Sequence, residues 1–181
     1  MTEPQPLVRL TKVTKEYFGV PAIREVDFTV WPGEVHALVG ENGAGKSTLT
    51  KVMVGIAFPT SGTLEVDGRP VTLRSPAEAL QMGLAMVFQE TSLVPSMTVA
   101  QNLYLGQEHF FTRLRGLYIA AQQFLQSLNF NVDPMTPVAN LGAAQKQMVE
   151  IARAVLRKAR LIIFDEPTAD RKSTRLNSSH Q

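Results

Sequence analysis

One run of eight residues constrains the fold of this chain more than any other feature. It reads Gly40-Glu41-Asn42-Gly43-Ala44-Gly45-Lys46-Ser47 and follows an apolar segment, Val35 to Val39. We expect that segment to be a short strand buried on both faces. A helical pattern begins at Lys46, with Leu49, Val52 and Met53 on one side. A strand, a glycine-rich loop and a helix in this order predict an α/β domain.

The residue types in this run suit the binding of a polyphosphate. Glycines allow the backbone N–H groups to approach the anion closely, and the following helix directs its positive end toward it. Lys46 would reach the β- and γ-phosphates, and the Ser47 hydroxyl would ligate Mg²⁺. The alternative is an ordinary glycine turn. The position of the run between an expected strand and an expected helix favours a phosphate-binding loop.

A second motif lies far along the chain, where the apolar segment Leu161 to Phe164 ends in Asp165-Glu166. We expect a third buried strand here, after a second one at Leu84 to Phe88. A parallel strand delivers the residues that follow it to the sheet edge where nucleotides bind. Asp165 can hold the water shell of the metal, and Glu166 can polarise an attacking water. Carboxylates often end strands, but together with the phosphate-binding loop these two indicate nucleotide hydrolysis.

The remaining pattern predicts an antiparallel β layer and a helical insertion. Leu7 to Val13 alternates like an edge strand, Val26 to Val30 alternates again, and turns at residues 59–62 and 67–68 bracket a hairpin strand, Thr63 to Val66. Ser75-Pro76-Ala77-Glu78 resembles a capping box that opens a short helix.

From about Thr98 to Phe130 the period is helical. The expected buried stripe consists of Leu114, Leu117, Ala121, Phe124, Leu125 and Leu128. After a proline-containing linker, another helix is expected to bury Met148, Ile151, Ala152 and Val155.

The last twelve residues have no helical or strand period. The translation of a widely used short-read sequencing adapter matches residues Asp170 to His180 one for one, so we interpret residues 170–181 as an artefactual, disordered tail. Of the 18 basic and 16 acidic residues, three basic and one acidic residue lie in this tail, which leaves 15 of each. A neutral chain gives no reason to expect a nucleic-acid partner.

The chain resembles the ABC-type ATPases, and in particular the amino-terminal half of the duplicated ATP-binding subunit of bacterial monosaccharide importers of the ribose, galactose and xylose kind. The segments that carry the resemblance are GENGAGKSTL (40–49), RSPAEAL (74–80), MVFQE (86–90), LVPSMTVAQNLYLGQE (93–108), QMVEIARA (147–154) and LIIFDEPTA (161–169). The resemblance implies a P-loop NTPase of the ABC ATPase type, with an antiparallel β layer and an inserted helical subdomain. Residues 1–169 would form one incomplete, C-terminally truncated nucleotide-binding domain, with the helical subdomain at about 95–140.

The resemblance also assigns site residues. ATP would contact Tyr17, Gly40, Glu41, Asn42, Gly43, Ala44, Gly45, Lys46, Ser47, Thr48 and Gln89. Tyr17 would stack on adenine, whereas its position alone favours a core or edge aromatic. Gln89 would contact the metal together with Ser47 and Asp165, whereas its position alone favours a solvated loop residue. Glu166 would be the catalytic carboxylate.

Leu141-Gly142-Ala143-Ala144-Gln145 occupies the position of the family's signature motif, usually LSGGQ. Gly142 replaces the serine whose hydroxyl bonds the γ-phosphate held by the partner domain, and Ala144 replaces the last glycine. That hydroxyl bond cannot form here, although the backbone amides at the helix start could still serve.

The implied activity of the intact parent is ATP hydrolysis with Mg²⁺ that energises monosaccharide import. The implied partners are a second ATPase domain, membrane permease subunits and, indirectly, a periplasmic sugar-binding protein. The expected location is peripheral, on the cytoplasmic face of the inner membrane. Two alternatives remain: a soluble ABC ATPase without a permease, and a nucleotide-binding fragment without turnover. We expect the 181-residue polypeptide itself to be inactive because strands beyond Leu161 to Phe164 are missing.

Overall fold

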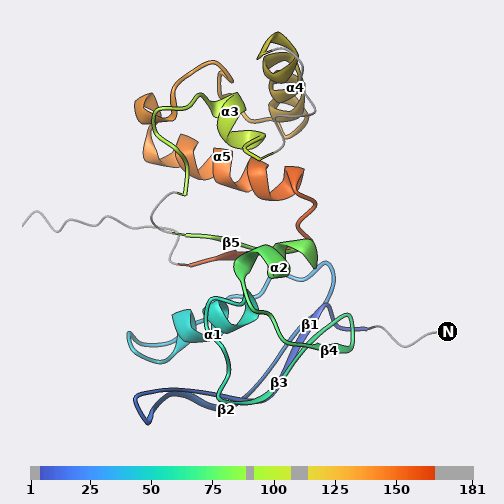
Figure 1. Ribbon diagram of the computed structural model, residues 1–181, viewed down its shortest axis with the longest axis vertical. Helices are drawn as coiled ribbons and strands as arrows, with labels where there is room; N and C mark the ends of the chain where they lie inside the picture. The colour runs from blue at the N-terminus through green and yellow to red at the C-terminus, as the bar shows by residue number, and fades with distance from the viewer. Residues whose placement is uncertain (1–4, 89–91, 107–113, 166–181) are drawn as a thin grey trace, which may run out of the picture.

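The computed structural model describes residues 5–88, 92–106 and 114–165 (Figure 1). The elements in chain order are β1 (Val8–Tyr17), β2 (Val20–Val30), α1 (Lys46–Met53), β3 (Ser61–Val66), β4 (Arg69–Val71), α2 (Pro76–Gln81), β5 (Leu84–Val87), α3 (Val99–Leu103), α4 (Leu114–Ser127), the 3₁₀ helix η2 (Val138–Asn140), α5 (Ala143–Leu156) and β6 (Leu161–Phe164). Figure 1 shows β1 to β4 and α1 at one end of the long axis, α3 to α5 at the other, and β5, β6 and α2 between them. None of the helices in the described ranges is long and apolar enough to cross a membrane.

The antiparallel layer that the sequence predicts is present. Its strand order is β2-β1-β3-β4, and Val8 pairs with Val30 on one side and with Val66 on the other. The expectation of an edge strand at Leu7 to Val13 is wrong, because β1 lies between β2 and β3. Alternation of apolar and polar residues indicates that one face of a strand is buried. It does not indicate how many neighbouring strands pair with that strand.

The predicted hairpin and helix start are also present. Val66 pairs with Arg69, and Asp67 and Gly68 between them have positive φ angles of 50° and 66°. Two consecutive positive angles suit the tight turn of a two-residue hairpin. At α2, Ser75 caps the helix by accepting the N–H of Glu78. The Glu78 carboxylate accepts from Arg74 instead of Ser75, so only half of the predicted capping box forms.

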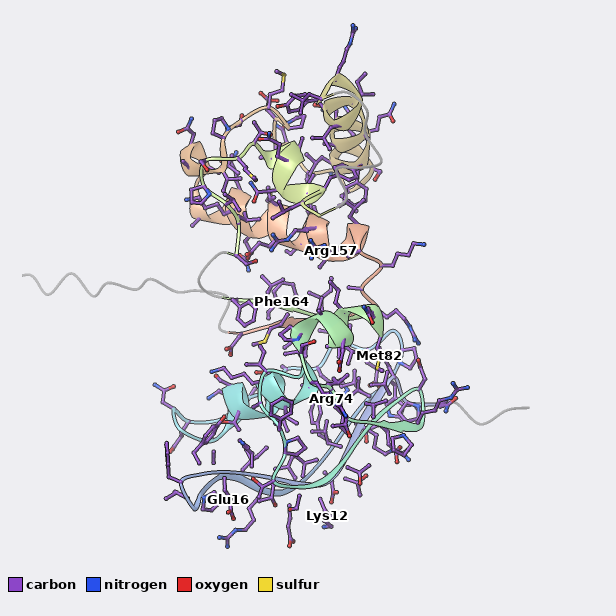
Figure 2. The ribbon with its side chains drawn as sticks, viewed as in Figure 1. Lys12, Glu16, Arg74, Met82, Arg157 and Phe164 are labelled. Atoms are coloured by element: carbon purple, nitrogen blue, oxygen red, sulfur yellow. The ribbon has the colours of Figure 1, made fainter. Side chains whose placement is uncertain are left out.

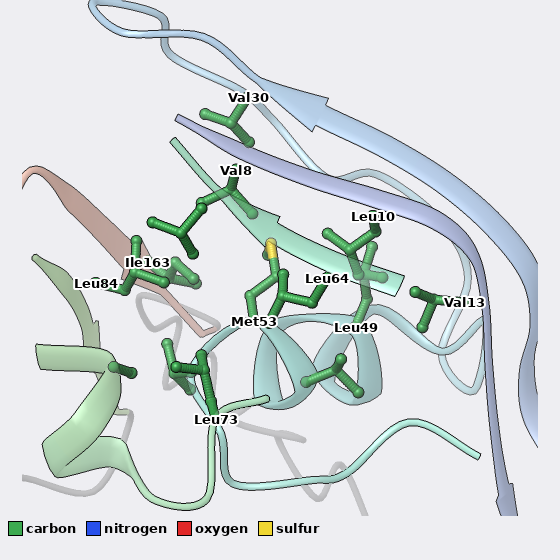
Figure 3. Packing of buried hydrophobic residues seen from close by; sticks show 14 of the residues in the cluster. Val8, Leu10, Val13, Val30, Leu49, Met53, Leu64, Leu73, Leu84 and Ile163 are labelled. Atoms are coloured by element: carbon green, nitrogen blue, oxygen red, sulfur yellow. The ribbon is translucent and has the colours of Figure 1, made fainter. Parts of the chain in front are cut away.

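The first hydrophobic core lies between this sheet and α1. Leu49 and Met53 on α1 pack with Val8, Leu10 and other apolar side chains that are at most 9% exposed (Figure 3). The same cluster includes Leu84 of β5 and Ile163 of β6. Each fully buried side chain of this size contributes about 1.5 to 3 kcal/mol. The core therefore fixes α1 between the antiparallel layer and the β5–β6 pair.

The strands β5 and β6 form a parallel pair, with Leu84 opposite Leu161 and Val87 opposite Phe164. The prediction that Leu161 to Phe164 is buried on both faces is only partly correct: Ile163 is buried, but Phe164 is 42% exposed. In the described part of the chain β6 pairs with β5 alone, and a strand with one partner has an open edge and partly open faces.

The strand predicted at Val35 to Val39 does not form. No ladder includes these residues within the ranges described, and Val35 and Val39 are 100% and 88% exposed. The segment instead follows a turn in which Glu34 accepts the N–H of Trp31 and pairs with His36, whose ring packs edge-on against Phe28. An apolar strand of this kind requires hydrogen-bonded neighbours on both sides, and none of the described strands takes that place.

A second hydrophobic core lies among α3, α4 and α5. Its buried members run from Leu93 to Ala152. Leu117, Ala121 and Leu125 are buried as predicted, but Leu114 at the first position of α4 is 62% exposed and the expectation for it is wrong. A helix end has fewer neighbours than its middle.

The predicted buried face of α5 is mostly wrong. Met148 and Val155 are each 38% exposed, and of the predicted set only Ala152 is buried. Val149 and Ala152 pack into the second core, while Glu150 and Ala154 are buried on the side that faces β5. Helix α5 therefore buries two narrow faces, one against the second core and one against β5. The hydrophobicity of the sequence alone does not identify these faces, because they include small residues and a charged one.

A cavity of about 170 Å³ lies between α5 and β5, lined on the helix side by Glu150, Arg153 and Arg157. Figure 2 shows Arg157 on the α5 side of this region and Phe164 on the strand side. Arg157 donates a hydrogen bond of 3.1 Å to the backbone oxygen of Leu105.

Candidate functional site

The glycine-rich loop leads directly into α1. Gly43 and Gly45 adopt positive φ angles of 87° and 90°, which only glycine adopts without strain. The N–H of Ala44 donates to the oxygen of Glu41, and that of Leu49 donates to the oxygen of Gly45. The loop residues from Gly40 to Ala44 are mostly exposed. An exposed loop with free access to backbone amides at a helix start is a suitable anion site.

Gly45 also fits against β2. A Cβ atom added there would lie 2.4 Å from Cγ2 of Ile23 and 2.6 Å from the oxygen of Ala22. At Gly43, no atom of the described residues lies within 4 Å of the same position. The two glycines therefore serve different purposes: Gly43 provides the turn, and Gly45 permits the helix start to touch the neighbouring strand.

The Lys46 ammonium folds back over the loop. It donates to the backbone oxygens of Gly40 at 2.7 Å and of Glu41 at 2.8 Å. These bonds hold the positive charge against the backbone of the glycine-rich loop. The charge is therefore positioned in advance for an anion, and a phosphate oxygen would share or replace the two carbonyl acceptors.

The two predicted motifs meet in space. The Ser47 hydroxyl donates to Oδ1 of Asp165 at 3.1 Å, although 118 positions separate them. Ser47 is the second residue of α1, and Asp165 follows β6 directly, with its N–H donating to the oxygen of Val87 on β5. Helix α1 and the parallel strand pair thus deliver a hydroxyl and a carboxylate to one point.

This pair fits a magnesium ion by its donor chemistry. Mg²⁺ prefers oxygen ligands and is commonly held by one carboxylate, a hydroxyl and substrate phosphates. Ser47 and Asp165 supply two such oxygens beside the loop. Gln89, the third metal ligand expected from the sequence, lies outside the described residues, as does the expected catalytic Glu166.

Tyr17 lies at the end of β1 and is 43% exposed. The Lys15 ammonium is 4.9 Å from the centre of its ring, in a cation–π contact. The next residue, Phe18, is fully exposed and has a φ of 52°. Tyr17 is therefore not a core aromatic, and its role in stacking on adenine stays a prediction.

The residues at the signature position form the start of α5. Gly142 is the N-cap, in an extended conformation, and its N–H donates to Oε1 of Gln145 at 3.2 Å. Leu141 is buried, while Gly142, Ala143, Ala144 and Gln145 are exposed. The helix start is thus open, with the N–H groups of its first turn available to an anion. These residues lie on the α3–α5 side of the molecule, apart from the loop before α1 (Figure 1).

Two buried polar residues were missed by sequence reasoning. Asn102 has no exposed surface, accepts the N–H of Val94 at 2.7 Å, and donates to the oxygens of Val94 and Thr98, both at 3.0 Å. Glu150 is 4% exposed and binds Ser92. Each lies near the apolar stripe of its helix, and a polar residue at such a position is the signal that could have revealed it.

The ABC transporter family matches residues 23–169. A ribose import ATP-binding protein of Rubrobacter xylanophilus is 49% identical over 168 residues, covering 91% of this chain and 34% of the relative. An arabinose import ATP-binding protein of Pectobacterium atrosepticum is 43% identical, covering 93% of this chain and 34% of the relative.

Solved structures of ATP-binding cassettes have a similar fold. A crystal structure of a nucleotide-free ATP-binding cassette from an ABC transporter superposes with a TM-score of 0.77 at 25% identity, covering 91% of this chain and 70% of that one. The structure of cbiO1 from Clostridium perfringens gives 0.76 at 26% identity, covering 92% and 67%. The fold is therefore that of an ABC-type P-loop ATPase domain.

The chain spans about a third of the length of the curated relatives that it matches. The family match covers far more than half of this chain and ends at residue 169, just before the segment that matches the adapter. It includes the phosphate-binding loop, Asp165 and the start of α5. The chain belongs to the ABC transporter family.

Proposed function

We propose that the protein binds ATP with Mg²⁺ at the loop before α1 and that the intact gene product hydrolyses it. The observation that carries this proposal is the 3.1 Å contact between Ser47 and Asp165, because it joins the two motifs that the sequence predicts to bind a nucleotide. Family membership implies nucleotide binding. The loop amides and Lys46 would bind the phosphates, and Tyr17 would stack on the base.

Ser47 and Asp165 would hold the metal, joined by Gln89. When bound, Mg²⁺ neutralises charge on the β- and γ-phosphates. Asp165 accepts a hydrogen bond from the Ser47 hydroxyl, so its carboxylate is held beside the loop before any ligand arrives. Glu166 would orient and polarise the attacking water. The chain's own contribution is thus to position ligands and to place a carboxylate next to the γ-phosphate.

The proposed role of the hydrolysis is to energise import of a monosaccharide through a membrane permease. The support is that the relatives are described as ribose, arabinose and ribose/galactose/methyl galactoside import ATP-binding proteins. The partners would be permease subunits, a second ATPase domain and, indirectly, a periplasmic sugar-binding protein. The protein would then act as a peripheral subunit on the cytoplasmic face of the inner membrane.

A second candidate function is nucleotide binding without turnover at the site formed by the partner domain's phosphate-binding loop and the signature position of this chain, which includes Gly142. The observation that favours it is the glycine at the position of the signature serine, which leaves no hydroxyl for the γ-phosphate of the partner domain. A soluble ABC ATPase without a permease is the other alternative, and association with a permease distinguishes it from the first proposal.

The test is sugar uptake and ATP hydrolysis by the complete gene product with its permease, comparing the natural protein with Glu166→Gln. Labelled ribose, arabinose and galactose would be tried in turn. The proposal predicts uptake of at least one sugar and a loss of uptake and hydrolysis on the order of 100-fold in the variant. ATP turnover without a permease partner would favour the soluble alternative, and binding without turnover would favour the second candidate.

A further inference from the structure

Ser92 is fastened to α5 by a buried carboxylate. Its backbone N–H donates to Oε1 of Glu150 at 2.7 Å, and its hydroxyl donates to the same oxygen at 3.1 Å. Glu150 is 4% exposed whereas Ser92 is exposed, so the two bonds are partly buried. Ser92 and Glu150 are 58 positions apart, and the contact joins two distant segments of the chain.

Arg153, one turn along the same face of α5, holds Ser92 from the other side. Its guanidinium donates to the Ser92 backbone oxygen at 3.4 Å and to the Ser92 hydroxyl oxygen. Burial lowers the pKa of Arg153, and the nearby Arg157 adds to this effect. The serine hydroxyl donates to a carboxylate and accepts from a guanidinium, so its orientation is fixed from both sides. We call Ser92, Glu150 and Arg153 the serine clamp.

The serine clamp lies between two segments to which the sequence assigns nucleotide contacts. Ser92 comes three residues after Gln89, the expected metal ligand. Glu150 and Arg153 lie on α5, which begins directly after Gly142 at the signature position. A helix of 14 residues is rigid over this length, so any displacement of Ser92 along the clamp's bonds would displace the start of α5.

Stability alone does not explain the clamp. A carboxylate removed from water loses favourable hydration, and replacing buried charged groups by packed apolar residues is often neutral or stabilising. The cavity beside β5 is lined by apolar residues such as Val87, Phe88 and Ala154, and also by Arg153 and Arg157. The Glu150 carboxylate holds the backbone N–H of Ser92 at one location. A role in positioning Ser92 relative to α5 explains why a charged residue is present there.

We propose that Glu150 is a positioning residue for ATP hydrolysis: through the serine clamp it fixes the signature-position start of α5 relative to the segment that follows Gln89. The inference rests on the proposed ATPase function. In this proposal Glu150 contacts neither nucleotide nor metal. It fixes the relative positions of two segments to which the sequence assigns such contacts.

The test measures kcat and KM for ATP in the complete gene product with its permease, for Glu150→Ala and for Glu150→Gln. Glu150→Ala removes the acceptor, and we expect kcat to fall about 3- to 30-fold with KM for ATP within twofold. Glu150→Gln retains an acceptor oxygen, and its kcat should stay within about twofold of the natural protein, since the N–H of Ser92 keeps its partner. Equal loss in both variants, or a change in KM alone, would overturn the proposal.

Ala152→Gly is the matched control. Ala152 lies on α5 and is buried, and glycine there weakens the helix without removing a hydrogen bond to Ser92. The kcat of this variant should be unchanged at temperatures well below unfolding. If it lowered kcat as much as Glu150→Ala does, the effect would be general destabilisation and the proposal would be wrong.

A second readout does not depend on activity. Hydrogen exchange of the segment 92–97 should quicken in Glu150→Ala and stay slow in Ala152→Gly, because the Ser92 amide has lost its acceptor. Unchanged exchange would overturn the proposal even if the natural protein proved to have no ATPase activity. Should Glu150→Ala fail to fold, Glu150→Leu replaces it: leucine fills more of the space of the glutamate but accepts no hydrogen bond from Ser92, so kcat should fall about as far, while Glu150→Gln retains it.

Discussion

The Ser47 hydroxyl donates a hydrogen bond of 3.1 Å to Asp165, from the second residue of α1 to the residue that follows β6. The two residues reach each other because α1 packs in the same core as β6, and because β6 runs parallel to β5 and ends at that edge. A hydroxyl and a carboxylate at one point beside the glycine-rich loop are the oxygen donors that the proposed magnesium-nucleotide site requires.

The first prediction concerns Lys46. Replacement by alanine removes an ammonium that the loop carbonyls of Gly40 and Glu41 hold in place, and a charged hydrogen bond of this kind contributes about 1.5 to 3 kcal/mol. Lys46→Ala should therefore weaken ATP binding by about 10- to 100-fold, measured by calorimetry. Lys51→Ala, in the last turn of the same helix, is the control and should bind ATP normally. Equal ATP affinities for the natural protein, Lys46→Ala and Lys51→Ala would contradict the assignment of Lys46 to phosphate binding.

The second prediction separates the two loop glycines. Gly45→Ala combines a positive φ with contacts of 2.4 and 2.6 Å, whereas Gly43→Ala meets only the positive φ. Gly43→Ala should lower the free energy of unfolding by about 1 kcal/mol, and Gly45→Ala by about 2 to 4 kcal/mol, because overpacking adds to the backbone strain. Urea denaturation compares them. Equal losses would show that the close approach of Gly45 to β2 is absent in solution.

Local motifs were predictable from the sequence, and pairings between distant segments were less so. The start of α1 at Lys46 and the turn at Asp67-Gly68 follow from neighbouring residues and are present. Ser47 and Asp165 were assigned to a metal from two separate motifs, the glycine-rich loop and the end of the apolar segment Leu161 to Phe164. The structure brings the two residues into contact, and their role as metal ligands stays a prediction.

The failures concern burial that depends on partners. Val35 to Val39 has the composition of an interior strand, but composition does not supply the neighbouring strands that such a segment requires. Met148 and Val155 lie on the most hydrophobic face of α5, yet the helix buries Val149 and Glu150 instead. The burial of Glu150 depends on Ser92, a contact that no periodicity of a single helix encodes.

The third prediction restores a hydroxyl at the signature position. A Cβ atom added at Gly142 would lie 3.9 Å from Oε1 of Gln145, an ordinary contact distance, and the φ of −68° suits any residue. Gly142→Ser should fold normally and gain a few tenths of a kcal/mol as an N-cap. ATP hydrolysis by the intact protein should rise several-fold if this half-site is active. Gly142→Ala is the control, and equal rates for the serine and alanine variants would contradict the expected hydroxyl contact.

The fourth prediction concerns the bidentate pair of Asp67 and Arg160, with bonds of 2.6 and 2.9 Å that fasten the β3–β4 turn to the start of β6. The Arg160 guanidinium lowers the pKa of Asp67. The pair therefore stabilises the fold above the ordinary aspartate pKa of about 3.9, and the effect disappears as pH falls through the lowered folded-state pKa. Both side chains are about half exposed, so the contribution at neutral pH is about 0.5 to 1 kcal/mol.

Asp67→Asn tests this pair, since asparagine tolerates the φ of 50° at this position. The variant should be less stable than the natural protein at pH 7 and equally stable near pH 2, in urea denaturation at low salt. At about 1 M salt the difference at pH 7 should shrink. A difference that persists at pH 2 would assign the stabilisation to something other than the ionised carboxylate.

The measurement that tests the central claim most directly is a calorimetric titration of ATP into the complete gene product, with Mg²⁺ and with EDTA, for the natural protein and for Ser47→Ala, Asp165→Asn and the double variant. If the two side chains serve one metal, Mg²⁺ will strengthen ATP binding in the natural protein, each single variant will lose most of that gain, and the double variant will lose little more than either. A magnesium effect that survives Asp165→Asn unchanged would contradict the account.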